Sequence, residues 1–220
     1  MSAHIIAVIP AYNEEKTITE AIRRTKKHVD RVVVVDDGSM DNTALMAKKE
    51  GAIVVQNPVN MGVGTSKRLG IQKALGLGAD LIVTLDADLQ HQPEDIPRFI
   101  EKLGEGYSFV LGRRDISKYP FVKKFGNFGL NILTNILAGT GFRLMDTESG
   151  FKAFTRDAAL KMDLTAERYA IEAEIAYEVG KNKIPCATIE IDSPRYRKGV
   201  TVMHGFRNFW FLLGKKVRDA

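Results

Sequence analysis

Two aspartates, Asp86 and Asp88, follow the apolar run LIVTL with only Ala87 between them. Carboxylates this close repel each other, and a cation is the usual compensation at the end of a strand. Hard oxygen ligands suit Mg²⁺ or Mn²⁺, which keep positions open for phosphate oxygens. Such an ion would neutralise a departing diphosphate. The alternative is a solvated acidic turn before a helix that starts near Pro93. The pair predicts a metal site if other polar groups converge on it.

A second acidic pair, Asp36 and Asp37, ends the run RVVVV. These carboxylates can accept hydrogen bonds from a nucleobase N–H or a ribose hydroxyl, and Gly38 permits a close backbone approach. Asp41 or Asn42 is expected only to cap the next helix.

The segment PAYNEE follows the first apolar run. Tyr12 can stack on a base, whereas Glu14 also suits the N-terminus of the helix that follows. Gly62 and Gly64 of NMGVG are compatible with a phosphate-cradling loop, but the pattern lacks the lysine arrangement of a P-loop. As a lone glycine pattern it is a weak indication.

Arginine binds phosphate oxygens through a two-pronged fork, so Arg113 and Arg114 are candidates for phosphate contacts. Further basic groups in the second half are Lys123, Lys124, Arg195, Arg197 and Lys198. Acidic candidates for a base or a sugar-hydroxyl contact are Asp146, Glu148, Glu172 and Glu174. For Glu172 and Glu174 we expect positions on a helix surface. The histidines have no zinc-ligand spacing.

These residues follow a regular alternation of strand and helix patterns. Strands are expected at HIIAVIP, RVVVVDD, AIVVQN, DLIVTLD and SFVLG, and later at 187–191. Helices are expected at 16–28, 42–50, 65–77, 94–103, near 171–181 and at 205–220. Strands that are apolar on both faces and alternate with helices predict a three-layer α/β fold with a mainly parallel sheet. Because ligands bind at the carboxyl ends of such strands, the polar clusters should form one site.

Composition sets the remaining limits. The 220 residues are enough for one substantial core, and 45% apolar with 27% charged residues indicates a globular protein. The net charge of +5 favours an acidic partner, but no nucleic-acid recognition motif accompanies it. Cys186 is the one cysteine and is expected to be buried. The first apolar stretch is too short for a signal peptide, so we expect a cytoplasmic protein.

The motifs PAYNEE, VVVDDGSMDNT, N-x-G-x-G, LDADLQH and D-x-x-SGFK, in this order, resemble the family 2 glycosyltransferases. The similarity covers residues 4–155 strongly, and within the family it is greatest to the dolichyl-phosphate and polyprenyl-phosphate sugar synthases. It implies a GT-A fold, an inverting transfer and a divalent metal, Mg²⁺ or Mn²⁺. The expected partners are a UDP- or GDP-sugar, with the sugar a hexose or N-acetylhexosamine, and dolichyl or another polyprenyl phosphate.

The resemblance also assigns residues. A nucleotide-sugar pocket would include Pro10, Tyr12, Glu14, Asp36, Asp37, Asp86 and Gln90. Asp86 and Asp88 would bind the metal, and Asp88, Arg114 and Asp146 would be the catalytic set. The acceptor phosphate would meet Arg114, Lys123, Lys124 and Arg197. Asp88 or Asp146 would act as a base only if the acceptor were a hydroxyl.

The C-terminal segment GFRNFWFLLGKKVRDA combines apolar and basic residues. We expect a GT-A domain over 1–204 and an amphipathic helix over 205–220 that attaches to the inner face of a membrane. Docking of this helix on the domain, a homodimer contact and a membrane-protein partner stay open. Two other functions also stay open: a soluble family 2 glycosyltransferase with a saccharide acceptor, and a non-catalytic nucleotide-sugar-binding protein.

Overall fold

A computed structural model of the chain describes residues 3–115, 131, 132, 134–140, 144–192 and 202–219. The candidate phosphate ligands Lys123, Lys124 and Arg197 lie outside the described residues.

The described residues form one seven-stranded sheet in the order β3-β2-β1-β4-β6-β5-β7. The strands are β1 (Ile5–Ala11), β2 (Arg31–Asp36), β3 (Ile53–Gln56), β4 (Leu81–Thr84), β5 (Phe109–Arg114), β6 (Lys152–Thr155) and β7 (Cys186–Ile191). Strands β1 to β4 pair in parallel, as do β5 and β7. Strand β6 lies antiparallel between β4 and β5. The six predicted strands are confirmed, whereas β6 was not predicted.

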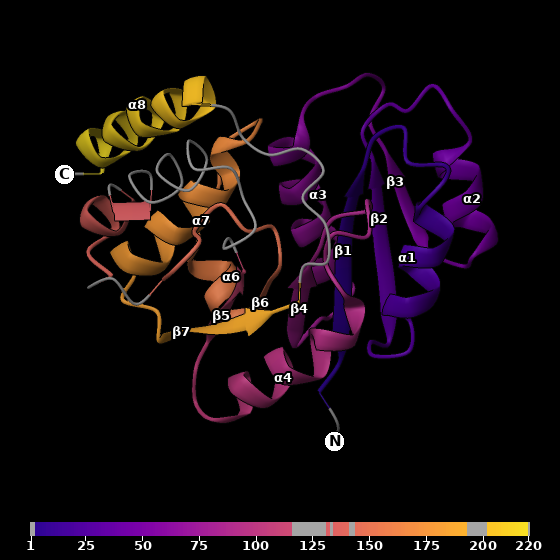
Figure 1. Cartoon of the computed structure of the whole chain (residues 1–220), viewed down its shortest axis with the longest axis horizontal. Coiled ribbons are helices and arrows are strands. Elements are labelled where there is room, and N and C mark those ends of the chain that lie inside the picture. Colours follow the sequence, from indigo (N-terminus) through magenta and orange to yellow (C-terminus); the bar gives the residue numbers. More distant parts are fainter. Residues whose placement is uncertain (1–2, 116–130, 133, 141–143, 193–201, 220) are drawn as a thin grey trace.

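Helices cover both faces of this sheet (Figure 1). They are α1 (Ile18–Thr25), α2 (Thr43–Lys49), α3 (Val63–Gly76), the short 3₁₀ turn η1 (Pro93–Asp95), α4 (Ile96–Gly104), α6 (Arg156–Lys161), α7 (Ala170–Lys181) and α8 (Val202–Arg218). Apolar residues of α1, α2 and α4 pack on one face of the sheet, and those of α3, α6 and α7 pack on the other. The predicted three-layer α/β architecture with a mainly parallel sheet is therefore confirmed.

The burial of the central strands explains why the pattern predicted them well. Val32 to Val35 of β2 are all buried, so successive side chains enter the cores on opposite faces. Helix α3 lies close against β1 at Gly70, where a Cβ atom would come within 2.2 Å of Val8 Cγ1. A glycine at this point lets the helix approach the sheet.

Helix α8 begins at Val202, before the predicted start at Gly205, and it packs beside α7 (Figure 1). Leu212 is buried in a small core with Ala173 and Tyr177 of α7. The opposite side exposes Trp210, which is 66% accessible. The docked arrangement is therefore present, while attachment to a membrane stays a prediction. Among the described residues, no helix combines the length and apolar character that crossing a membrane requires.

Candidate active site

The polar clusters that follow β1 to β5 meet along one edge of the sheet, as predicted. The parallel pairing of β4 with β1 and of β1 with β2 brings their carboxyl ends together, and β5 points the same way because both it and β4 pair antiparallel with β6. Among the described non-glycine residues, Asn13, Leu89, Asp146 and Lys183 have positive φ angles. The first three lie at this edge, and such strained backbone is concentrated at functional sites.

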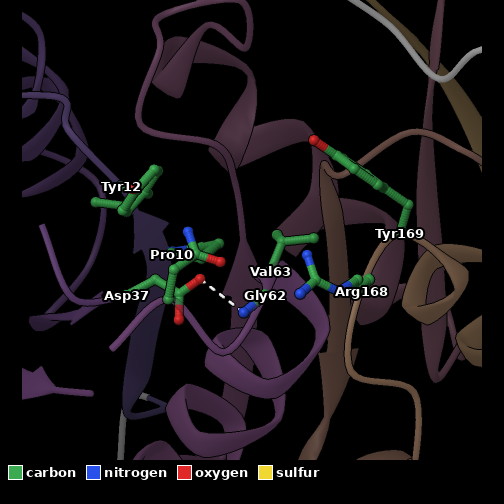
Figure 2. Close-up of a pocket in the computed structure, with 9 residues that line it drawn as sticks. Pro10, Tyr12, Asp37, Gly62, Val63, Arg168 and Tyr169 are labelled. Carbon is green, nitrogen blue, oxygen red and sulfur yellow. Dashed lines mark hydrogen bonds between the residues drawn. The ribbon is translucent and has the colours of Figure 1, made fainter. Parts of the chain in front are cut away.

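A pocket of about 290 Å³ opens at this edge between the end of β1 and the start of α3 (Figure 2). Its lining is Pro10, Ala11, Tyr12, Asp37, Asn60, Gly62, Val63, Arg168 and Tyr169. Pro10, Tyr12 and Asp37 were predicted for a nucleotide pocket. Arg168 and Tyr169 were missed, because they come from the segment before α7, which carries no recognisable motif.

Asp37 holds the far wall of the pocket in place. Its Oδ1 accepts hydrogen bonds from Asn57 Nδ2 at 2.7 Å and from the Met61 amide at 3.0 Å, and its Oδ2 accepts from the Gly62 amide at 2.9 Å. Figure 2 shows the bond to Gly62. The Asp37 carboxylate therefore fixes the loop before α3, and Asp37 itself also lines the pocket.

Asp36 and Glu14 do not line this pocket. Asp36 is buried, and its Oδ1 accepts a hydrogen bond from the Ser39 amide at 3.3 Å. Glu14 accepts from Thr17 Oγ1 at 2.7 Å at the start of α1, which is the alternative role that the sequence left open. Asp41 behaves as expected at the start of α2, where its Oδ1 accepts from the Thr43 amide at 3.0 Å.

Gly62 and Gly64 allow another part of the chain to approach closely. A Cβ atom on Gly62 would lie 2.5 Å from the Glu167 carbonyl oxygen, and one on Gly64 would lie 2.5 Å from that of Ala166. The Gly62 amide is already bonded to Asp37. These contacts account for the two glycines without a phosphate-cradling role.

Asp86 and Asp88 follow β4 and sit in a turn held by their neighbours. Gln90 donates its backbone N–H to Asp88 Oδ1 at 3.0 Å and its Nε2 to Asp88 Oδ2 at 2.6 Å, so two hydrogen bonds hold this carboxylate. The Asp86 amide donates to His91 Nδ1 at 3.2 Å. Behind the turn, Gly150 leaves the space that the Asp86 carboxylate occupies, since a Cβ there would lie 2.7 Å from both oxygens.

The ionisation of this turn differs from residue to residue. Burial raises the pKa of Asp88, and the charge of Asp86 raises it further. Desolvation by the surrounding protein also opposes ionisation of Asp86, but the charges of His91 in its protonated form, of Lys67 and of Arg114 outweigh it, so the pKa of this carboxyl lies below its usual value. Burial lowers the pKa of His91 to about 4, so the ring is neutral at pH 7. Its approach of 3.5 Å to Asp86 Oδ2 is therefore not an ion pair at that pH.

The donor set at this turn fits a divalent cation that takes its other ligands from a substrate. The Asp86 side chain is 41% accessible, and the charge of Asp86 disfavours ionisation of Asp88 unless a cation is added. No group of three or more acidic, histidine or cysteine side chains suited to a metal occurs among the described residues. Mg²⁺ is commonly held by one or two carboxylates together with substrate phosphates and water, which matches this pair.

A buried cluster of charges lies behind Asp86. Glu172 of α7 contacts the ammonium groups of both Lys67 of α3 and Lys152 of β6, and the two lysine side chains are 0% exposed. Lys67 and Lys152 also help to keep Asp86 ionised. Glu174 is likewise fully buried. The prediction that Glu172 and Glu174 lie on a helix surface is therefore wrong, because both carboxylates point into the protein and bind buried partners.

Arg114 and Asp146 form a two-pronged ion pair. Arg114 donates from Nε to Oδ2 and from Nη2 to Oδ1 of Asp146, both at 2.7 Å, and its backbone amide also donates to Oδ2 at 3.1 Å. Both oxygens of Asp146 are therefore engaged, which favours orientation of the arginine over proton abstraction. Arg113 lies nearby but is half exposed, and its Nη1 is 3.8 Å from Glu190.

Glu148, another acidic candidate, is buried. Its Oε2 accepts a hydrogen bond from Asn208 Nδ2 of α8 at 3.3 Å, whereas Oε1 has no hydrogen-bond partner among the residues that the structure describes. Burial, followed by the charge of Glu172, raises the pKa of Glu148 to about 8. Protonation of this side chain is therefore favoured at pH 7.

Comparison with known proteins agrees with this geometry. Residues 6–162 match the family model described as "Glycosyl transferase family 2". The chain is 35% identical to the UDP-N-acetylglucosamine–dolichyl-phosphate N-acetylglucosaminyltransferase of Methanococcus voltae, over 97% of this chain and 96% of that protein. It is 38% identical to an uncharacterized protein of Methanocaldococcus jannaschii, over 97% and 92% of the two chains.

Among solved structures, the fold is similar to that of glucosyl-3-phosphoglycerate synthase from Mycobacterium tuberculosis, determined in complex with Mn²⁺, UDP-glucose and phosphoglyceric acid. The TM-score is 0.78 at 22% identity, with 97% of this chain and 80% of that chain covered. The GT-A fold expected from the sequence is therefore confirmed.

Proposed function

The chain belongs to glycosyl transferase family 2, and we propose that this glycosyltransferase moves N-acetylglucosamine or a related hexose from a UDP-sugar to dolichyl or another polyprenyl phosphate. The observation that carries the proposal is the meeting, at one sheet edge, of the pocket beside Tyr12 and Asp37 with the carboxylates Asp86 and Asp88. The relative from Methanococcus voltae is named for a UDP-linked donor and a dolichyl-phosphate acceptor, which supports both substrate classes.

In the proposed complex the nucleoside occupies the pocket between Pro10, Tyr12 and the loop that Asp37 holds. Tyr12, 43% accessible, offers a face on which a base can stack. The diphosphate then extends along the sheet edge toward Asp86 and Asp88. Gln90 keeps the Asp88 carboxylate in one orientation through two hydrogen bonds.

Mg²⁺ or Mn²⁺, held by Asp86 and Asp88, would supply positive charge to the departing diphosphate. The chain's own contribution is to hold Asp86 ionised and both carboxylates in place. Lys67 and Lys152 help to keep Asp86 ionised, Gln90 orients Asp88, and His91 accepts the hydrogen bond that shapes the turn. The structural relative from Mycobacterium tuberculosis was determined with Mn²⁺, which supports a divalent ion as the cofactor.

A lipid phosphate is an anionic nucleophile at pH 7, so the acceptor needs orientation and charge compensation more than a base. Arg114 is proposed to meet this phosphate, with its guanidinium oriented by Asp146. Attack on the anomeric carbon from the face opposite the diphosphate inverts the configuration. Lys123, Lys124 and Arg197 stay predicted as additional phosphate contacts.

We also propose that the protein works at the inner face of a membrane, where its lipid acceptor resides. The exposed side of α8 carries Trp210 and Val217, which are 66% and 71% accessible, beside Lys216 and Arg218. Exposed apolar and aromatic residues together with cations on one helix are typical of a helix that lies on an anionic lipid surface.

The test is transfer of radiolabelled sugar from UDP-N-acetylglucosamine, UDP-glucose and GDP-mannose to dolichyl phosphate in detergent, with Mg²⁺, Mn²⁺ or EDTA. We expect a butanol-extractable product with a UDP-sugar and a divalent ion. Asp88→Asn should lower turnover by at least about a hundredfold through loss of a charged ligand. Asp157→Asn, at an exposed position of α6, is the matched control. Transfer to phosphoglycerate or a free saccharide in place of the lipid would refute the acceptor assignment.

A further inference from the structure

The segment 165–169, which precedes α7, completes the pocket from the second half of the chain. Arg168 and Tyr169 line the pocket opposite Tyr12 (Figure 2). The backbone of this segment rests on the start of α3, where the Thr65 amide donates to the Glu167 carbonyl at 3.0 Å. The position of Arg168 is therefore set by how the segment is held.

Arg168 differs in charge from everything else around the pocket. Among the described lining residues it is the one cation, and Asp37, the one anion, already accepts three hydrogen bonds. The Arg168 guanidinium makes no ion pair with any described residue. A guanidinium at the rim of a nucleotide pocket is suited to phosphate oxygens.

Glu174 of α7 fixes the beginning of this segment. Its carboxylate accepts hydrogen bonds from the Thr165 amide at 2.9 and 3.0 Å, from Thr165 Oγ1 at 2.7 Å and from the Ala166 amide at 2.8 Å. Glu178, one turn further along α7, accepts from the Asp163 amide at 3.1 Å. Two fully buried carboxylates thus brace the chain just before Arg168.

Lys215 of α8 supplies the positive charge that these carboxylates share. Its side chain is 2% exposed, and its Nζ lies 3.2 Å from Glu174 Oε1 and 3.3 Å from Glu178 Oε1. It also donates to the Asp163 carbonyl at 2.6 Å. Lys181 reaches Glu178 at 3.4 Å from a partly exposed position, but Lys215 is the one cation paired with Glu174 among the described residues.

We propose that Lys215, acting through Glu174, positions Arg168 to bind the diphosphate of the donor nucleotide. Removing the Lys215 charge leaves the buried carboxylates of Glu174 and Glu178 repelling each other. Glu174 then shifts, and its hydrogen bonds to residues 165–166 weaken. Arg168 then loses its fixed place at the pocket. The C-terminal helix is thereby a structural part of the donor site. The proposal rests on the proposed function only in taking a nucleoside diphosphate as the ligand.

The test is calorimetric titration of the full chain with UDP, and in parallel with GDP, in the presence of Mg²⁺. Lys215→Met should weaken nucleotide binding by about tenfold, the loss expected for one charged phosphate contact. Lys216→Met is the matched control, because Lys216 lies next on the same helix, is exposed and bonds only the Leu137 carbonyl among described residues. It should bind as the wild type does.

A double-mutant cycle separates positioning from general loosening. Arg168→Met alone should also weaken binding by about tenfold, and Lys215→Met added to it should weaken binding little further, since both act through one contact. Fully additive losses, or unchanged binding by Lys215→Met, would overturn the proposal.

Two further outcomes are informative. If Lys215→Met lacks the native near-ultraviolet circular dichroism spectrum, Thr165→Val replaces it in the cycle, because it removes only the hydroxyl bond to Glu174, and binding should weaken about threefold. If the wild-type protein binds neither UDP nor GDP, the proposed donor class fails together with this inference. Wild-type binding with an unaffected variant rejects this inference alone.

Discussion

Glu172 is placed where the removal of one charge should have a large effect. It lies between the ammonium groups of Lys67 and Lys152, and all three side chains are buried. Glu172→Gln preserves the shape of the side chain and removes its charge. The two lysines then face each other in the interior, and Asp86 is a remaining anion with which both interact.

The expected loss in the free energy of unfolding follows from the loss of the anionic partner that Lys67 and Lys152 share. Removing one partner of a buried ion pair costs about 3–5 kcal/mol of the free energy of unfolding, because the other charge stays buried. Asp86 retains part of the compensation, so we expect about 3 kcal/mol. In a protein of this size 1 kcal/mol shifts the melting temperature by about 2–4 °C, which gives a decrease of about 6–12 °C.

Equilibrium urea unfolding at pH 7, followed by circular dichroism, measures this difference. Glu101→Gln, at an exposed position of α4, is the matched control and should change the free energy of unfolding by less than about 0.5 kcal/mol. If the free energy of unfolding of Glu172→Gln equals that of this control, the Glu172 charge does not stabilise the two lysines, which refutes this reasoning.

A triple replacement separates stability from activity. Lys67→Met, Lys152→Met and Glu172→Leu together substitute apolar groups of similar volume, and such replacements of buried ion clusters are often neutral or stabilising. We expect stability to recover. Turnover should stay low, because Asp86 loses two neighbouring positive charges. Full turnover by the triple variant would show that the buried cluster does not contribute to catalysis.

Two other substitutions test single features of the site. Glu148, with its pKa raised to about 8, binds a proton in the folded state that the unfolded chain has lost above about pH 4.5. Its contribution to stability therefore falls by about 1.4 kcal/mol per pH unit from about pH 5 to 8, and Glu148→Gln should remove this slope in urea unfolding at several pH values. Equal slopes for the two proteins would contradict the assignment. Gly150→Ala places a Cβ atom 2.7 Å from the Asp86 carboxylate and should reduce turnover about a hundredfold. Gly104→Ala, where the added atom meets nothing within 4 Å, should leave turnover unchanged in the same assay, and equal turnover by both variants would show that Asp86 needs no such space.

The sheet and its polar edge were predictable because local patterns determine them. Runs such as Val32 to Val35 are apolar at every position, which only a strand buried on both faces requires. Once the strands were parallel, the clusters after β1, β2 and β4 had to share an edge. The proximity of Asp37, Asp86 and Asp88 could therefore be predicted without knowing their contacts.

The missed features depend on contacts between distant parts of the chain. Because lysine is usually exposed, the sequence favours a surface position for Lys67, and its buried partner Glu172 is 105 positions away. Strand β6 has the sequence KAFT and begins with the charged residue Lys152, so it lacks the apolar run that marks the equally short strands β3 and β4. Arg168 reaches the pocket because the chain returns over Gly62 and Gly64, a route that no local pattern encodes.

The antiparallel insertion of β6 between β4 and β5 also has a consequence for how the chain folds. Strands β1 to β4 can pair as soon as residue 84 is available, since each finds its neighbour among the others. Strand β4 then has an open edge until residues 152–155 arrive, and β5, although made earlier than β6, joins the sheet only through β6 and β7. The half that carries Tyr12 and Asp37 can therefore assemble while synthesis continues. A chain released from the ribosome before β6 has emerged presents the open edge of β4, and nascent proteins associate with one another at such edges.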